Sequence, residues 1–369
     1  MSHLRQTESR APEHFTALTS MRGIAAWWVV FYHFRDHLPQ GGVLQNVAAH
    51  GFLAVDLFFV LSGFVLQLSY ARYFTCLTLT GVRAFAVARF ARIYPLHFFM
   101  CIAFLANVLS ILVFSKQASV GDRYTLSSYV LNIFLVQAWG LTDGLTWNAP
   151  AWSISTEFAA YLLFPAASYF ATRFLVRRDV AILALILELV LIAGLFAWKG
   201  DSSLGSDIQH NGVPRCVLEV VLGIIVLQFR SQYPALHQPV LLGATGLLLA
   251  GLGVFPDHVV FPAACAALIL ALTQSPSIAS GWLRVRPFVF LGEISYSTYL
   301  VHYFIKDWTN FLLVGKGFPD WFILFIYSAL VLGASVFCYT WIELPGRDRV
   351  RVFFGAKPKA GVEMGTARP

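Results

Sequence analysis

The stretch Arg22-Gly-Ile-Ala-Ala-Trp-Trp-Val-Val-Phe-Tyr-His33 decides how this chain is built. Ten apolar, aromatic or glycine residues separate its polar ends, and with residues 18–21 and 34 the run provides most of a membrane-spanning helix. Eleven helical steps turn through about 1100°, so Arg22 and His33 share one face and lie about 16 Å apart along the axis. A charge facing lipid costs about 2.5–3.5 kcal/mol near the bilayer centre. The shared face therefore predicts that both side chains point into one protein-lined cavity; the alternative is a helix-end anchor followed by an unrelated interfacial histidine.

The composition places the chain among membrane proteins. Of its 369 residues 58% are hydrophobic and only 12% are charged, and the mean hydropathy is +0.68. Apolar runs recur along nearly the whole chain, which predicts an all-α, polytopic integral membrane protein with about ten transmembrane helices. The five cysteines are scattered without a Cys-x-x-Cys pair, so neither a zinc site nor a disulfide framework is expected.

The apolar runs divide the chain into three parts. We expect a cytoplasmic N-terminal arm over 1–17, a transmembrane domain over 18–346 and a basic, disordered cytoplasmic tail over 347–369. The segment 129–139 is too short to cross a bilayer and should be re-entrant or interfacial. Full spans are predicted at 18–38, 51–71, 94–114, 150–172, 180–198, 213–229, 239–255, 258–275, 288–312 and 320–342.

The positive charges predict the orientation. With the N-terminus in the cytoplasm, about seven of the 26 Lys and Arg residues fall outside, in keeping with the positive-inside rule. Counting 129–139 as a further full span would invert everything after it and move five arginines to the outer side. That would contradict the positive-inside rule, so we reject this assignment. The chain should therefore lie in its membrane with both termini in the cytoplasm. The seven outer residues are Arg35, Lys116, Arg123, Lys199, Arg215, Lys306 and Lys316.

Two acidic residues inside apolar helices are candidate partners of His33, a residue suited to acid–base chemistry near neutral pH. Asp56 lies in GFLAVDLFFVLSGF (51–64) and Glu157 lies in PAWSISTEFAAY (150–161). An intramembrane carboxylate needs a partner or a water-filled cavity, so each is a functional-site candidate. In the first motif, Ser62 and Gly63 are better explained as a small-residue packing notch.

Three further motifs carry candidate binding residues. Arg89 and Arg92 in RFARIYP (89–95) share a helix face and could clamp a phosphate, although contact with anionic lipids is the simpler reading of this pair alone. Ser153, Glu157 and Tyr161 should form one stripe. A second stripe, Ser295, Tyr299 and His302, lies in LGEISYSTYLVH (291–302); interhelical hydrogen bonding is the simpler reading of Ser295 and Tyr299.

Together these motifs, with RGIAAWWVVFYHF (22–34) and IELPGR (342–347), resemble the integral membrane acyltransferase-3 family in order and spacing over roughly 15–346. The resemblance implies about ten helices in a bacterial inner (plasma) membrane, and transfer of an acyl group, usually acetyl, from cytoplasmic acyl-CoA to a hydroxyl. The implied acceptor is a carbohydrate such as O-antigen, exopolysaccharide or a lipooligosaccharide. Arg22 and His33 match the family's Arg-x10-His pair, and Arg89 and Arg92 match its RxxR motif.

The residues and the resemblance predict the same mechanism. Acetyl-CoA should dock from the cytoplasm on Arg22, Arg89 and Arg92, and its pantetheine arm should pass through a continuous passage to His33. His33 would act as general base or accept the acyl group itself, and the sequence leaves both open. Asp56 or Glu157 would support the imidazole, and no metal is expected. Trp152, Ser153, Ser295, Tyr299 and His302 are the expected substrate-binding residues.

Two alternatives stay open on the sequence. The donor could be succinyl-CoA, because the sequence does not show the pocket volume beside the thioester. A different class of protein, a glycan or lipid transporter, would use Asp56, Glu157 and His302 as a proton relay. The acceptor should meet the outer loops at about 116–150, 199–212 and 313–319.

Overall fold

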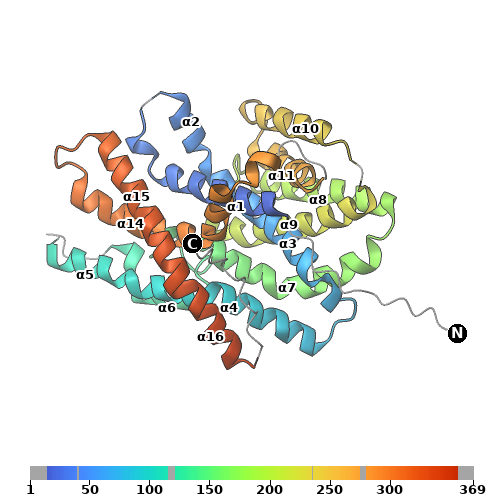
Figure 1. Ribbon diagram of the computed structural model, residues 1–369, viewed down its shortest axis with the longest axis horizontal. Helices are drawn as coiled ribbons and strands as arrows, with labels where there is room; N and C mark the ends of the chain where they lie inside the picture. Colours follow the sequence, from blue (N-terminus) through green and yellow to red (C-terminus); the bar gives the residue numbers. More distant parts are fainter. Residues whose placement is uncertain (1–14, 40, 115–120, 235, 275–279, 356–369) are drawn as a thin grey trace, which may run out of the picture.

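The computed structural model describes residues 15–39, 41–114, 121–234, 236–274 and 280–355. Within these ranges the chain forms helices and turns without a strand, which confirms the all-α prediction (Figure 1). The first half contains α1 (Thr16–His33), α2 (Val43–Ala49), α3 (Ala54–Tyr70), α4 (Leu79–Ala103), α5 (Leu105–Phe114), α6 (Leu126–Ile133) and α7 (Trp152–Phe174). The second half contains α8 (Arg178–Lys199), α9 (Ile208–Gln232), α10 (Gln238–Ala250), α11 (Asp257–Thr273), α12 (Ser280–Leu283), α13 (Arg286–Glu293), α14 (Ser295–Leu313), α15 (Asp320–Cys338) and α16 (Leu344–Phe353).

Long apolar helices confirm the membrane character of the chain. Among the described residues, five helical stretches are long and apolar enough to cross a bilayer. The predicted number of about ten spans is not confirmed by this criterion and stays a prediction. The five stretches are Val43–Tyr73, Leu79–Phe114, Arg178–Lys199, Ile208–Gln232 and Asp320–Phe353.

Helix α1 lies in the middle of the molecule, with α3, α11, α13 and α14 packed around it (Figure 1). Small residues on α1, including Ala25 and Ala26, are buried against these neighbours. The central position explains why one helix can carry two polar residues: its polar face meets protein instead of lipid.

Two pairs of glycines, Gly63 with Gly223 and Gly23 with Gly292, allow the central helices to approach closely. A Cβ atom on Gly63 of α3 would lie 1.9 Å from the carbonyl oxygen of Val220 on α9, and one on Gly223 would lie 2.0 Å from the carbonyl oxygen of Val60. A Cβ atom on Gly292 of α13 would likewise lie 2.0 Å from the carbonyl oxygen of Thr19 on α1. Gly63 is thus in a packing notch as predicted, whereas Ser62 donates a hydrogen bond to Glu157.

Three element boundaries differ from the predictions. Helix α4 begins at Leu79, fifteen residues before the predicted span at 94–114, because the Thr78 side chain caps it by accepting from the backbone N–H of Gly81. The predicted span 288–312 is broken at Ile294, between α13 and α14. The tail predicted to be disordered starts as a helix, since α16 runs to Phe353; residues 356–369 and most of the N-terminal arm lie outside the described residues.

Candidate active site

A cavity of about 140 Å³ lies among α1, α3, α4, α7 and α14, and we call it the arginine cavity. These helices come from distant parts of the chain, so the cavity exists only in the folded protein. The predicted site residues that line it are Arg22, Arg89, Arg92, Ser153, Glu157, Ser295 and Tyr299.

The three arginines differ in how far their guanidinium groups are already paired. Arg92 forms an ion pair with Glu343. Arg89 donates a 3.0 Å hydrogen bond to the hydroxyl of Tyr70, and its buried Nε has no partner. Arg22 makes no hydrogen bond or ion pair with any residue in the described part of the chain. The cavity therefore offers unpaired N–H donors and positive charge, which suit a phosphate group.

One carboxylate lines the same cavity. Glu157 accepts a 2.5 Å hydrogen bond from the Ser62 hydroxyl. Ser153 and Tyr161, four residues on either side of Glu157 along α7, also line the cavity, so this predicted stripe does face a common space. Because three arginines surround one glutamate, the lining carries a formal excess of positive charge.

His33, at the C-terminal end of α1, is in contact with a second histidine. Its Nδ1 lies 3.0 Å from the carbonyl oxygen of Val29 and 3.2 Å from Nε2 of His302. The ring also packs edge-on against Tyr303, with ring centres 5.2 Å apart. His302 is fully buried, and its Nδ1 lies 2.7 Å from the carbonyl oxygen of Tyr299.

These contacts fix which nitrogen of each ring carries a proton. A carbonyl oxygen can only accept, so Nδ1 of His302 carries the proton, and Nε2 of the neutral ring is an acceptor. Nδ1 of His33 likewise carries the proton, which it shares between Val29 and His302. Nε2 of His33 is then left with a lone pair, the state required of a general base or a nucleophile.

The arginine cavity does not extend to His33 in this structure, so it is not by itself the expected continuous passage. Tyr299 lines the arginine cavity, whereas His33 does not. The backbone of Tyr299 holds His302, and His302 in turn contacts His33. His33 thus lies beyond Tyr299 and His302 as viewed from the arginines. The Tyr299 hydroxyl is held by Ser153, at 2.8 Å, and by the carbonyl oxygen of Pro150, at 3.0 Å.

Asp56 does not support His33 as expected. Both of its carboxylate oxygens are bound by Arg215, at 2.6 and 2.7 Å, and both residues are almost completely buried. An arginine inside a span attracts a carboxylate, because an unpaired charge there would be expensive. His302 takes the place beside His33 that Asp56 or Glu157 was predicted to occupy.

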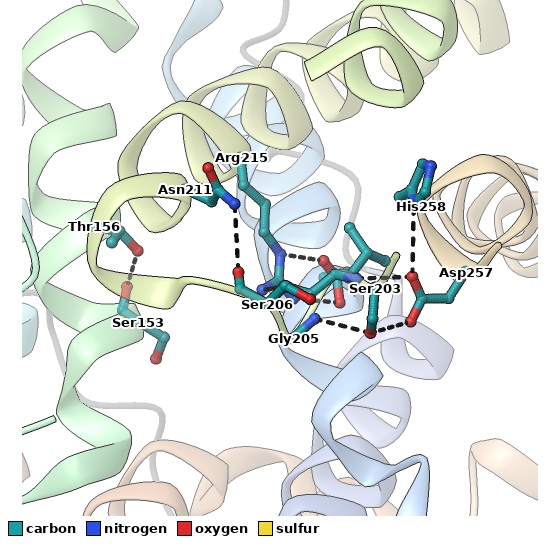
Figure 2. Close-up of polar contacts among 11 residues, drawn as sticks. Ser153, Thr156, Ser203, Gly205, Ser206, Asn211, Arg215, Asp257 and His258 are labelled. Carbon is teal, nitrogen blue, oxygen red and sulfur yellow. Dashed lines mark hydrogen bonds and ion pairs between the residues drawn. The ribbon is translucent and has the colours of Figure 1, made fainter. Parts of the chain in front are cut away.

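The same arginine holds the loop between α8 and α9. Its Nη1 donates to the carbonyl oxygen of Leu204, and Asp257 binds the backbone N–H of Leu204 at 2.7 Å and the Ser203 hydroxyl at 2.6 Å (Figure 2). Trp152, an expected substrate-binding residue, packs on Arg215 with 5.5 Å between the guanidinium carbon and the ring centre, and it does not line the arginine cavity. We therefore assign this cluster a structural role.

Several residues of the site were missed by sequence reasoning. Tyr70 and Glu343 pair with the cavity arginines, and Tyr303 covers His33. Glu343 could have been found, because it is a carboxylate at the end of the apolar span 320–342. Arg215 could have been found as well, as a charge inside the predicted span 213–229. For Tyr70 and Tyr303 the sequence holds no such signal.

Comparison with known proteins gives the family. The family model described as an acyltransferase domain matches residues 15–340. The chain belongs to the acyltransferase-3 family. This acyltransferase is 30% identical over 337 residues to acyltransferase MdmB of Streptomyces mycarofaciens, an alignment that covers 83% of each chain. It is 22% identical to O-acetyltransferase OatA of Staphylococcus aureus (strain NCTC 8325 / PS 47) over 95% of this chain and 60% of that protein. No solved structure matches it.

Proposed function

We propose that this acyltransferase moves an acyl group, in the simplest case acetyl, from cytoplasmic acyl-CoA to a hydroxyl of a carbohydrate acceptor at the bacterial inner membrane. The observation that carries the proposal is an arginine cavity near a histidine, His33, that is hydrogen-bonded to the described residues through Nδ1 alone, which leaves Nε2 available for chemistry. The name of the relative OatA, an O-acetyltransferase, supports a hydroxyl acceptor and an acetyl group.

The donor fits the arginine cavity by its charge. Coenzyme A carries several phosphates, and Arg22 and Arg89, which both line the cavity, have guanidinium groups that are not paired with a carboxylate of the described residues. The two residues at the ends of the Arg-x10-His motif are about 16 Å apart along α1, which suits the extended pantetheine arm. The thioester would then reach His33 once the Tyr299 side chain has moved aside.

His33 performs the chemistry through Nε2. In direct transfer, Nε2 takes the proton of the acceptor hydroxyl while the hydroxyl oxygen attacks the thioester carbon; the C–S bond breaks, and the proton passes to the CoA thiolate. In the covalent route, Nε2 attacks the thioester carbon and the C–S bond breaks, which releases the CoA thiolate; the acceptor oxygen then attacks the acyl carbon, the bond to Nε2 breaks, and the hydroxyl proton passes by way of Nε2 to the thiolate. Both routes leave the proton on Nδ1 in place, held by Val29 and His302.

The proton-relay alternative finds no support in the contacts. Asp56 binds Arg215, Glu157 binds Ser62, and His302 binds His33 and Tyr299. None of the three relay candidates is hydrogen-bonded to another.

The test is a pair of variants in purified, membrane-reconstituted protein. We expect His33→Ala to abolish acyl transfer, measured by mass spectrometry of the acceptor, and to retain acetyl-CoA binding. Arg22→Ala should instead act on binding: we expect its affinity for acetyl-CoA to fall about tenfold, because a charge-assisted contact is lost. His50→Ala, at an exposed histidine, is the matched control. Acyl transfer by His33→Ala at the wild-type rate would refute the proposal.

A further inference from the structure

A second cavity lies on the other side of His33. It has a volume of about 210 Å³ and is formed by α5, α14 and the short turn Asp122–Tyr124. On α14, Asp307 follows His302 by five residues, about 7.5 Å along the axis, and Tyr299 precedes it. We call this second cavity the outer cavity. It and the arginine cavity lie on opposite sides of His33 and His302.

A hydrogen-bonded network builds the outer cavity. The buried amide of Asn107 donates to the hydroxyl of Tyr124 at 3.3 Å and to Oδ2 of Asp307 at 3.0 Å, and it accepts from the indole N–H of Trp308 at 2.9 Å. Arg123 donates to the same oxygen of Asp307 at 2.9 Å. One buried side chain thus holds an acid and two aromatic rings in fixed positions.

The network leaves one acceptor unused. No residue in the described part of the chain donates to Oδ1 of Asp307, and the side chain of Asp307 is 21% exposed. The charge of Asp307 is balanced by Arg123, so the cavity does not attract an ion. Trp308 and the exposed Phe311 supply apolar walls. A balanced acid with a spare acceptor beside aromatic rings suits a neutral ring that carries hydroxyl groups.

The outer cavity is connected to His33 by one side chain. The ring centre of Tyr303 lies 4.9 Å from the guanidinium carbon of Arg123 and 5.2 Å from the ring centre of His33. A molecule held at Asp307 would therefore need only to pass Tyr303 to bring a hydroxyl to His33.

We propose that the outer cavity binds a neutral sugar ring of the acceptor, with Oδ1 of Asp307 accepting a hydrogen bond from one hydroxyl and Trp308 and Phe311 covering the apolar face of the ring. The inference rests on the proposed transferase function. It adds where the acceptor binds and that the bound part of the acceptor is uncharged. Donor and acceptor would meet at His33 from opposite cavities.

The experiment measures steady-state kinetics with defined probes. The acceptors are rhamnose, N-acetylglucosamine and chitotriose, with glucuronic acid as a charged comparison and acetyl-CoA as donor. We expect transfer to at least one neutral sugar and less to glucuronic acid. Asp307→Asn, Trp308→Ala and Phe311→Ala should each raise the KM for the sugar about tenfold while the KM for acetyl-CoA stays within twofold. Phe311→Ala changes an exposed side chain, so it tests the cavity without endangering the fold.

The matched controls are Asp143→Asn and Trp321→Ala, which remove the same groups at exposed positions outside the cavity and should keep both wild-type KM values. Transfer to none of the neutral sugars, or unchanged sugar KM values in all three cavity variants, would overturn the inference. Failure of the underlying function looks different: the wild type would release no CoA from acetyl-CoA, or His33→Ala would release it at the wild-type rate.

Discussion

At the scale of single residues, His33 makes its hydrogen bonds to the described residues through Nδ1. Val29 and His302 both accept from this nitrogen, so the ring cannot turn Nε2 away from the reaction without losing both contacts. A neutral histidine in this supporting role adds no charge to a buried site, whereas a carboxylate would. The pair therefore orients the base without requiring a further cation nearby.

The support from His302 can be tested by comparing two substitutions. His302→Gln can still present a side-chain oxygen to the Nδ1 proton of His33, whereas His302→Leu cannot. We expect His302→Leu to lower kcat about 100-fold with little change in the KM for acetyl-CoA, and His302→Gln to recover at least part of that loss. Equal activity in the two variants would mean that the hydrogen bond does not position His33.

Residue identities were more predictable than residue partners. The spacing of Arg22 and His33 and the stripe around Glu157 follow from the turn of one helix, and both indicated polar faces that the fold buries. The pairing of Asp56 with Arg215 depends on how α3 and α9 are rotated against each other, which spacing along one chain does not contain. The position of Tyr299 and His302 between the arginine cavity and His33 likewise depends on how side chains of different helices pack together.

At the scale of elements, α14 connects the whole site. Ser295 and Tyr299 line the arginine cavity, His302 and Tyr303 contact His33, and Asp307 lines the outer cavity, all within one helix. The sequence predicted an apolar span here and a polar stripe, but it did not predict the break at Ile294 that separates α13 from α14.

The close approach of α3 and α9 gives a prediction for stability. A methyl group at Gly63 would lie 1.9 Å from a backbone oxygen of α9, which cannot move aside as a side-chain end could. We expect Gly63→Ala to destabilise the protein by about 1–3 kcal/mol or more, seen as a lower Tm in detergent. Gly246→Ala on α10 meets no atom within 4 Å and should leave the Tm unchanged or raise it slightly. Equal Tm values for the two variants would show that the helices do not pack this closely.

At the scale of the whole molecule, we propose that the two cavities are the donor side and the acceptor side of the site. Composition alone predicted the all-helical membrane class, because so apolar a chain cannot remain soluble. The number of spans is harder to predict, since broken helices such as α13 and α14 divide one apolar run into unequal parts. The distribution of positive charges predicts that the arginine cavity faces the cytoplasm.

The orientation can be measured on the unmodified chain, because Cys76, between α3 and α4, is exposed while the other four cysteines are buried. Arg89 is hydrogen-bonded to Tyr70, the last residue of α3, so the arginine cavity lies near the end of α3 that leads into this loop. Cys76 should therefore face the compartment that supplies acyl-CoA. We expect a membrane-impermeant maleimide to label Cys76 only after the inner membrane has been opened. A second variant, Trp321→Cys at the opposite end of the molecule, should be labelled in sealed cells. Labelling of Cys76 in sealed cells would place the arginine cavity on the outer side, where it could not receive cytoplasmic acyl-CoA.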